Sequence, residues 1–176
     1  PGHANLLVES EKINFMCDPW LVGENLNSTV WMYPPRRVTI SDLPKLDFIY
    51  VSHDHKDHCN SATLKELPKD IHFYILNFPN KHDVVYKRLI ECGMKNIHIL
   101  EPCNTTRIDN NTKITIYPAD AGWIDSAAII EHNGFTIMHS NDCELTESTY
   151  RQIGKKFNVD MAFLPYAEFS GFPACY

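Results

Sequence analysis

The chain has 176 residues, of which 44% are hydrophobic and 22% charged, and its 16 Lys and Arg against 22 Asp and Glu give a formal charge of −6. This composition predicts one folded domain over residues 1–176. It excludes a disordered chain, because disordered chains have too little apolar surface to form a core. An acidic chain without a run of Lys or Arg lacks the clustered positive charge that nucleic acids and anionic membranes bind. We therefore expect neither as a partner.

Features of the whole sequence also bear on its location. No apolar run reaches the roughly 20 residues that cross a bilayer, and the first residues lack the basic-then-apolar order of a signal peptide. The six cysteines are widely spaced, and no two of them form a C-x-x-C pair. We therefore expect a reduced, cytoplasmic protein.

The first half of the chain predicts an opening hairpin followed by alternating strands and helices. Ala4–Glu9 and Ile13–Cys17 are the expected hairpin strands, and Asp18-Pro19 ends the second because proline cannot donate to a ladder. The continuous apolar run Asp47–Ser52 predicts a strand buried on both faces. The next expected elements are a short helix from Asn60 or Ser61 to Leu67, a strand over Ile71–Leu76, a helix over Lys81–Cys92 capped by Asn80, and a strand over Ile97–Leu100.

The second half returns to strands, which we place at Lys113–Tyr117, Ser126–His132 and Phe135–His139. Asn133-Gly134, between the last two, is the strongest short signal for a tight hairpin. Thr146 begins a helix to about Lys156, and Asp160–Leu164 predicts another buried strand. Because hairpins and helices are intermingled, we expect an α/β fold with two sheets covered by helices rather than a purely parallel sheet.

The segment His53-Asp54-His55-Lys56-Asp57-His58 follows the predicted buried strand and holds three imidazoles and two carboxylates. Divalent metal ions bind to this mixture of nitrogen and oxygen ligands. On one loop, His53 and His55 can turn toward one ion while Asp57 and His58 point to a second, at the roughly 3.5–4 Å separation of a two-metal site. The alternative is a surface loop that is rich in histidine and binds no metal.

The spacing H-x-H-x-D-H after a strand, with GHANLLVE and CDPWL before it, resembles the signature of the metallo-β-lactamase superfamily. The resemblance implies an αββα sandwich, in which helices cover two mixed sheets. It implies that His53 and His55 bind a first metal ion and that Asp57 and His58 bind a second. Asp142, after the strand Phe135–His139, matches the aspartate that bridges the two ions, and Asp57 and Asp142 are the candidate catalytic residues.

Two ligands of the family are missing from their usual positions. The stretch YPADAGWIDSAAII, where a third histidine for the first metal is expected, contains none; Asp120 is the nearest candidate there, with Asp125 behind it. No histidine follows Asp142, where the family has its last ligand. Either the sequence is a fragment that is incomplete at its C-terminus, or something else, such as Glu168 or a water, completes the second site.

The segments IDSAAIIEHNGFTIMHSNDC and SGFPACY also resemble the metallo-β-lactamase-like part of the CMP-N-acetylneuraminate hydroxylases, which oxygenate the N-acetyl group of a sialic-acid nucleotide. With Asp120 in place of a histidine, the ligand set is rich in oxygen and suits iron or manganese better than an all-histidine zinc site does. These points favour O2-dependent hydroxylation of an N-acyl or nucleotide-sugar-like small molecule by two irons. The electrons would come from a partner protein.

Two other functions remain open. Two zinc ions would make the site a hydrolase of an ester, amide or phosphoester, because zinc lowers the pKa of bound water to about 7. A degenerate metal site would instead leave a non-catalytic module. His3 and Trp20 are weaker candidates for substrate contacts, since an N-terminal histidine is more often exposed and a tryptophan more often packs in the core. His139 is a further candidate ligand near Asp142.

Overall fold

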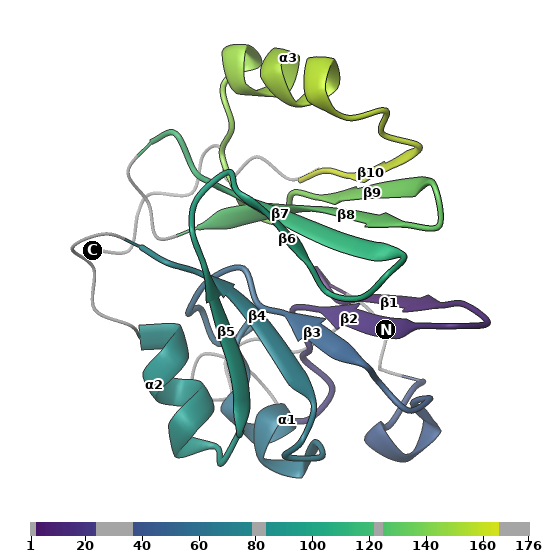
Figure 1. The fold of residues 1–176 in the computed structure, drawn as a ribbon. Coiled ribbons are helices and arrows are strands. Elements are labelled where there is room, and N and C mark those ends of the chain that lie inside the picture. The colour runs from purple at the N-terminus through teal and green to yellow at the C-terminus, as the bar shows by residue number, and fades with distance from the viewer. Residues whose placement is uncertain (1–2, 24–36, 79–83, 122–124, 166–176) are drawn as a thin grey trace.

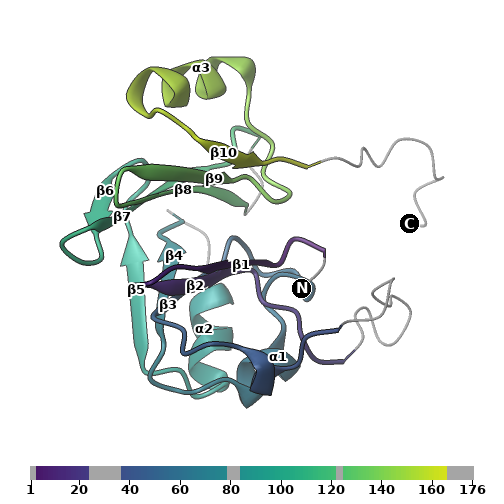
Figure 2. The ribbon, with the colours of Figure 1, turned by 90° about the vertical axis from the view of Figure 1, so that its right-hand side faces the viewer.

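The computed structural model describes residues 3–23, 37–78, 84–121 and 125–165. In this part of the chain two five-stranded sheets lie face to face, ordered β1-β2-β3-β4-β5 and β10-β9-β8-β7-β6. Helices α1 and α2 cover the outer face of the first sheet, and α3 covers the outer face of the second (Figures 1 and 2). The predicted αββα sandwich of mixed sheets is confirmed.

The elements follow in chain order. The first sheet is built from β1 Leu6–Glu9, β2 Asn14–Cys17, β3 Phe48–Tyr50, β4 His72–Leu76 and β5 Asn96–Leu100. The second is built from β6 Thr105–Arg107, β7 Thr112–Pro118, β8 Ser126–His132, β9 Phe135–His139 and β10 Met161–Phe163. The helices are α1 Ser61–Glu66, α2 Val84–Glu91 and α3 Glu147–Lys156, and a short 3₁₀ turn covers Ile40–Asp42.

The two sheets differ in strand direction. In the first sheet β1 pairs antiparallel with β2, and β2 to β5 are parallel. In the second sheet β6 to β9 are antiparallel, and β10 is parallel to β9. Because parallel strands need crossovers, α1 and α2 both lie between strands of the first sheet in the sequence.

Local sequence signals set most element ends. The Asn60 side chain accepts a hydrogen bond from the Thr63 N–H at 2.8 Å, which caps α1 as predicted. Thr146 caps α3 in the same way. Asn133 and Gly134 have φ angles of +51° and +82°, the left-handed conformation that a tight hairpin turn between β8 and β9 requires. The predicted start of the second helix, with Asn80, lies outside the described residues.

The core has three layers. Between the sheets, the rings of Phe15 and Phe48 stack at 4.7 Å, and Ile114 packs against the same cluster. On the other face of the first sheet, Ile49 packs with Leu64 below the helices. Burying each such side chain contributes about 1.5–3 kcal/mol. Phe48 and Ile49 are both fully buried on opposite faces, so the predicted strand with two buried faces is confirmed.

One expectation about strands was wrong, and one strand was missed. Asp160–Leu164 was expected to be buried, but Met161 and Phe163 in β10 are 47% and 37% exposed. In the described part of the chain β10 pairs only with β9 and lies at the edge of its sheet, which leaves its side chains open. Strand β6 was not predicted. Among the described helices, none has the length and apolar character needed to cross a membrane.

Candidate metal centre

The candidate site lies at one end of the sandwich, where β2, β3 and β9 end and β1 and β8 begin. The parallel strands β2 and β3 deliver Asp18 and the His53–His58 loop to this end. The antiparallel pairing of β8 with β9 places Asp125 and Asp142 on neighbouring strand ends. Residues far apart in the sequence therefore meet at one edge of the two sheets.

The His53–His58 loop is held in a compact turn. The N–H groups of His58 and Cys59 donate to the His55 carbonyl at 3.0 and 2.7 Å. The Asn60 side chain donates to the Lys56 carbonyl at 3.0 Å. These bonds let one short loop present several side chains to the same point.

Asp18 is the buried anchor of the site. Its carboxylate accepts hydrogen bonds from the Ser52 N–H and the Ser52 hydroxyl, each at 2.8 Å. Its Oδ2 atom also lies 3.1 Å from Nδ1 of His58 and 3.3 Å from Nε2 of His139. Although burial favours the neutral form, the bonds from His139 and His58 hold the pKa of Asp18 well below its usual range. Asp18 is thus a buried anion that orients two histidines.

Sequence reasoning treated Asp18 only as the residue that ends a strand. The structure adds a φ of +48°, in the left-handed region that non-glycine residues enter at a cost of about 1–3 kcal/mol. An acidic residue directly after a buried strand, before proline and ahead of a histidine-rich loop, was the available signal. Its partners on β3 and β9 could not be read from local sequence.

Hydrogen bonds between the sheets keep the two halves of the site in register. The Tyr50 hydroxyl donates to the Ser126 carbonyl at 2.8 Å, and the Ser126 hydroxyl donates to the Ser52 carbonyl at 2.8 Å. The Asn141 amide also donates to the Ser126 carbonyl, at 2.7 Å. The start of β8 is therefore fixed to the residues that flank His53 and Asp142.

Two buried imidazole nitrogens at the site make no hydrogen bond. They are Nε2 of His53 and Nε2 of His58. In the described residues, one other buried side-chain nitrogen or oxygen lacks a hydrogen bond, Nδ1 of His139. The His58 atom lies 3.1 Å from Oδ2 of Asp142, as an ion pair whose direction does not suit a hydrogen bond. Buried polar atoms are normally satisfied, so these atoms point to a ligand.

The protonation of the two imidazoles is driven in opposite directions. Burial, together with the charge of His58, lowers the pKa of His53 to about 4. Burial also opposes charge on His58, but the carboxylates of Asp142 and Asp18 outweigh it and raise the pKa of His58 to about 10. The contact with His58 lowers the pKa of Asp142 in turn. At neutral pH His53 is therefore uncharged, whereas His58 and Asp142 carry opposite charges.

The structure brings together most of the predicted metal ligands. His53, His58 and Asp142 offer ligand atoms that lie within 4.8 Å of one another. Asp57 approaches the same cluster, with Oδ2 3.7 Å from Nε2 of His58. The centroid of the exposed His55 ring lies 4.5 Å from the centroid of the His53 ring. Together with the unpaired nitrogens, this donor set fits a divalent transition metal ion.

Asp120 lies away from the site, and Asp125 approaches His53 instead. The Asp120 carboxylate accepts hydrogen bonds from the Thr146 N–H at 2.7 Å and the Thr149 hydroxyl at 3.1 Å, at the start of α3. Oδ1 of Asp125 lies 3.1 Å from Nδ1 of His53. The pKa of Asp125 is raised, mainly by burial, which outweighs the opposing effect of His55. The strand β8 begins at Ser126, so the residue directly before it reaches the site.

The remaining candidates are placed as follows. His3 reaches the site, with Nε2 3.2 Å from Oδ2 of Asp57. Trp20 is only 1% exposed and packs its ring edge against His3 at 5.6 Å, so it supports that residue rather than offering a surface for a substrate. His139 is held by Asp18 as described above. Glu168 lies outside the described residues.

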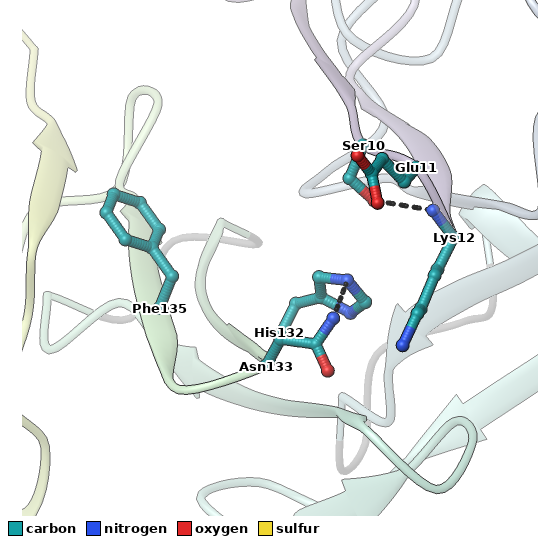
Figure 3. A pocket seen from close by; sticks show the side chains of 6 residues that line it. All are labelled: Ser10, Glu11, Lys12, His132, Asn133 and Phe135. Atoms are coloured by element: carbon teal, nitrogen blue, oxygen red, sulfur yellow. Dashed lines mark hydrogen bonds between the residues drawn. The ribbon is translucent and has the colours of Figure 1, made fainter.

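A shallow pocket of about 380 Å³ lies at the opposite end of the strands. Figure 3 shows its side chains, which come from the β1–β2 and β8–β9 turns: Ser10, Glu11, Lys12, His132, Asn133 and Phe135. None of these residues belongs to the cluster around His58, so the pocket plays no part in the candidate metal centre.

Comparison with known proteins places this geometry in context. Residues 14–170 match the family described as a β-lactamase superfamily domain. A cytidine monophosphate-N-acetylneuraminic acid hydroxylase of Asterias rubens is 31% identical to this chain in an alignment 185 residues long. The alignment covers 97% of this chain and 26% of the relative. The chain thus spans about a quarter of that relative's length.

Solved structures share the fold. CmlA, a diiron β-hydroxylase from Streptomyces venezuelae, has a TM-score of 0.68 and 17% identity, covering 92% of this chain and 32% of that chain. A possible metal-dependent hydrolase from Veillonella parvula has a TM-score of 0.75 and 16% identity, covering 97% of this chain and 72% of that chain. At these identities the likeness concerns the fold alone.

Proposed function

This chain belongs to the metallo-β-lactamase superfamily, and we propose that it binds two divalent metal ions and hydroxylates an N-acyl or nucleotide-sugar-like small molecule with O2. The observation that carries the proposal is the group of His53, His58 and Asp142, whose candidate ligand atoms lie within 4.8 Å of one another and combine imidazole with carboxylate. A mixed set of imidazoles and carboxylates suits iron. The name of the 31% identical relative supports the substrate class.

In this proposal the ligands form two adjoining groups. His53 and His55 would hold the first ion, Asp57 and His58 the second, and Asp142 would lie between them, while Asp125 would orient His53 through its Nδ1 atom. When bound, two irons supply the redox chemistry for inserting oxygen into a C–H bond, with electrons from a partner protein. The remaining steps depend on what the side chains of this chain hold and expose.

Asp18 determines which nitrogen of His58 is available. The contact from Nδ1 of His58 to Asp18 leaves Nε2 directed at Asp57 and Asp142. Because Asp18 and His58 are both fully buried, solvent does not compete for this bond. The ligand is thus oriented before a metal ion arrives, which reduces the cost of binding.

Asp142 is open to a substrate. Its side chain is 50% exposed, whereas His53 and His58 are buried. The lowered pKa of Asp142, caused first by its contact with His58, keeps the carboxylate ionised at neutral pH. Asp142 can therefore accept a hydrogen bond from the reacting molecule on the solvent side of the site.

The second candidate function is hydrolysis of an ester, amide or phosphoester. It is favoured by the same exposed, ionised Asp142, with Asp57 nearby, because two carboxylates beside a metal ion can orient and deprotonate a water. This reaction needs no electron donor. Zinc would suffice for it, since zinc acts as a Lewis acid and has no redox chemistry.

Loading one metal-free preparation with iron or with zinc separates the two functions. We expect iron-loaded protein to consume O2 in the presence of a reductant and a nucleotide sugar that bears an N-acyl group, with hydroxylated product detected by mass spectrometry. Zinc-loaded protein should hydrolyse esters and phosphodiesters slowly at best. Brisk hydrolysis by the zinc form, with no reductant-dependent O2 uptake by the iron form, would establish the second function instead.

A further inference from the structure

His3 is brought to the metal cluster by the segment that precedes β1. Its Nε2 atom lies 3.2 Å from Oδ2 of Asp57, and its ring lies 5.4 Å from the ring of His58 with the planes at 80°. The ligand atoms of these three residues all lie within 4.8 Å of one another. They form a second candidate metal group, which shares His58 with the group that contains Asp142.

The position of His3 is set by packing. The Trp20 ring meets it edge to face, at 5.6 Å and 73°. The backbone N–H of Trp20 donates to the side chain of Asn5, which fixes the start of β1 beside the residues that follow β2. His3 has a φ of +54°, a conformation that turns the chain before it enters the strand. The imidazole is thereby held over Asp57.

The spacing of the three ligand atoms suits a single ion. Ligand bonds of about 2.0–2.2 Å in a tetrahedral arrangement place neighbouring ligand atoms roughly 3.4 Å apart. Oδ2 of Asp57 lies 3.2 Å from Nε2 of His3 and 3.7 Å from Nε2 of His58. Nε2 of His58 is buried and makes no hydrogen bond, so it is free to act as a ligand atom.

A simple ion pair between His3 and Asp57 explains less. The two side chains are 38% and 23% exposed, and a pair so open to water contributes little to stability. Such a pair would also leave Nε2 of His58 without a hydrogen bond, since its contact with Asp142 is an ion pair. An ion shared by His3, Asp57 and His58 satisfies all three groups.

We propose that His3 is a ligand of the second metal ion, together with Asp57 and His58. This inference rests on the proposed two-metal site and adds a ligand from the N-terminal segment to the loop after β3. It makes the opening segment of the chain part of the metal centre.

Titration of metal-free protein that carries no histidine tag with Co²⁺ tests the proposal. We expect the wild type to bind two equivalents, and each bound imidazole to give a strongly shifted, solvent-exchangeable N–H signal in proton NMR. In His3→Gln the first equivalent should bind as before, the second should bind at least about tenfold more weakly, and one shifted signal should be lost. His72→Gln, whose residue pairs with His98 on the first sheet, should match the wild type.

The outcomes separate this inference from the proposed function. If His3→Gln binds both equivalents with wild-type affinity and keeps every shifted signal, His3 is not a ligand, although the two-metal site stands. If the wild type binds fewer than two equivalents, the two-metal site itself is refuted. Circular dichroism of each variant checks that the fold is retained, which is expected because His3 is exposed and precedes the first strand.

Discussion

Oδ2 of Asp18 lies 3.1 Å from Nδ1 of His58, and neither side chain is exposed to solvent. The contact joins the end of β2 to the loop after β3, which are neighbouring parallel strands. Oδ2 of Asp18 also reaches His139 at the end of β9, so one carboxylate connects both sheets. The precision of the metal centre therefore depends on a residue that need not touch a metal ion.

The first prediction concerns the charge of Asp18. Asp18→Asn preserves the size of the side chain but removes the anion that orients His58 and His139. We expect the affinity for Zn²⁺ or Co²⁺ to fall by about 10- to 100-fold, the usual effect of losing such a supporting carboxylate. Competition with a chromogenic chelator measures this change.

Asp42→Asn is the matched control, because Asp42 lies in an exposed 3₁₀ turn and, among the described residues, accepts hydrogen bonds from Thr39 alone. Its metal affinity should equal that of the wild type. Equal affinity in Asp18→Asn as well would show that His58 is oriented without Asp18.

The second prediction contrasts two aspartates that are close in sequence. Asp125→Ala should lower metal content, because it removes the carboxylate 3.1 Å from His53. Asp120→Ala should leave metal content unchanged and lower the free energy of unfolding by about 1 kcal/mol, because it removes hydrogen bonds at the start of α3. Elemental analysis and urea denaturation of both variants provide the measurements. The reverse pattern would return the ligand role to Asp120.

Much of the fold follows from local signals. The strands Ser126–His132 and Phe135–His139 match their predicted bounds, because Asn133-Gly134 specifies the turn between them. Strand β6 escaped prediction because Thr105–Arg107 has no apolar alternation and forms only through pairing with β7. The burial of β10 was misjudged because an apolar run does not reveal whether its strand lies at the centre or the edge of a sheet.

The site could be predicted only where its ligands are adjacent in sequence. The composition of the loop from His53 to His58, with three histidines and two aspartates, was enough to predict it. Asp142 was added only through the resemblance to the metallo-β-lactamase superfamily. The choice between Asp120 and Asp125 depends on where β8 begins, which is a property of strand pairing. His3 was judged more often exposed than functional, and only the pairing of β1 with β2 brings it to Asp57.

The third prediction concerns thiol reactivity. Burial raises the pKa of Cys59 and of Cys143 to about 12, so neither is a thiolate at pH 8 although each adjoins a candidate ligand. Cys103 is exposed and should react first with a disulfide reagent. The rates are measured in a Cys175→Ser background, with mass spectrometry identifying the modified residue. Modification of Cys59 or Cys143 ahead of Cys103 would show that the loops around the site open readily.

The last prediction concerns the stability of the metal-free protein as a function of pH. The pKa of His58 is about 10 in the folded state, against about 6.5 for an unperturbed imidazole. The folded state therefore binds the proton more tightly, and this stabilisation is complete below pH 6.5 and lost as the pH rises through 10. The pKa of His53 is lowered to about 4, so the unfolded state binds this proton more tightly. His53 therefore lowers the stability of the folded state as the pH falls from 6.5 through 4.

We therefore expect the metal-free protein to be most stable near neutral pH, with a decline on both sides in urea denaturation at pH 5, 7 and 10. The raised pKa values of Cys59 and Cys143 also lower stability above pH 9, so the comparison with His58→Gln isolates the imidazole. The loss between pH 7 and pH 10 should be smaller in that variant, and unchanged in His72→Gln.

A metal ion displaces the proton of His58, so Zn²⁺-loaded protein should gain stability between pH 7 and pH 8. Identical curves for wild type and His58→Gln would show that the carboxylates of Asp18 and Asp142 do not hold a proton on His58.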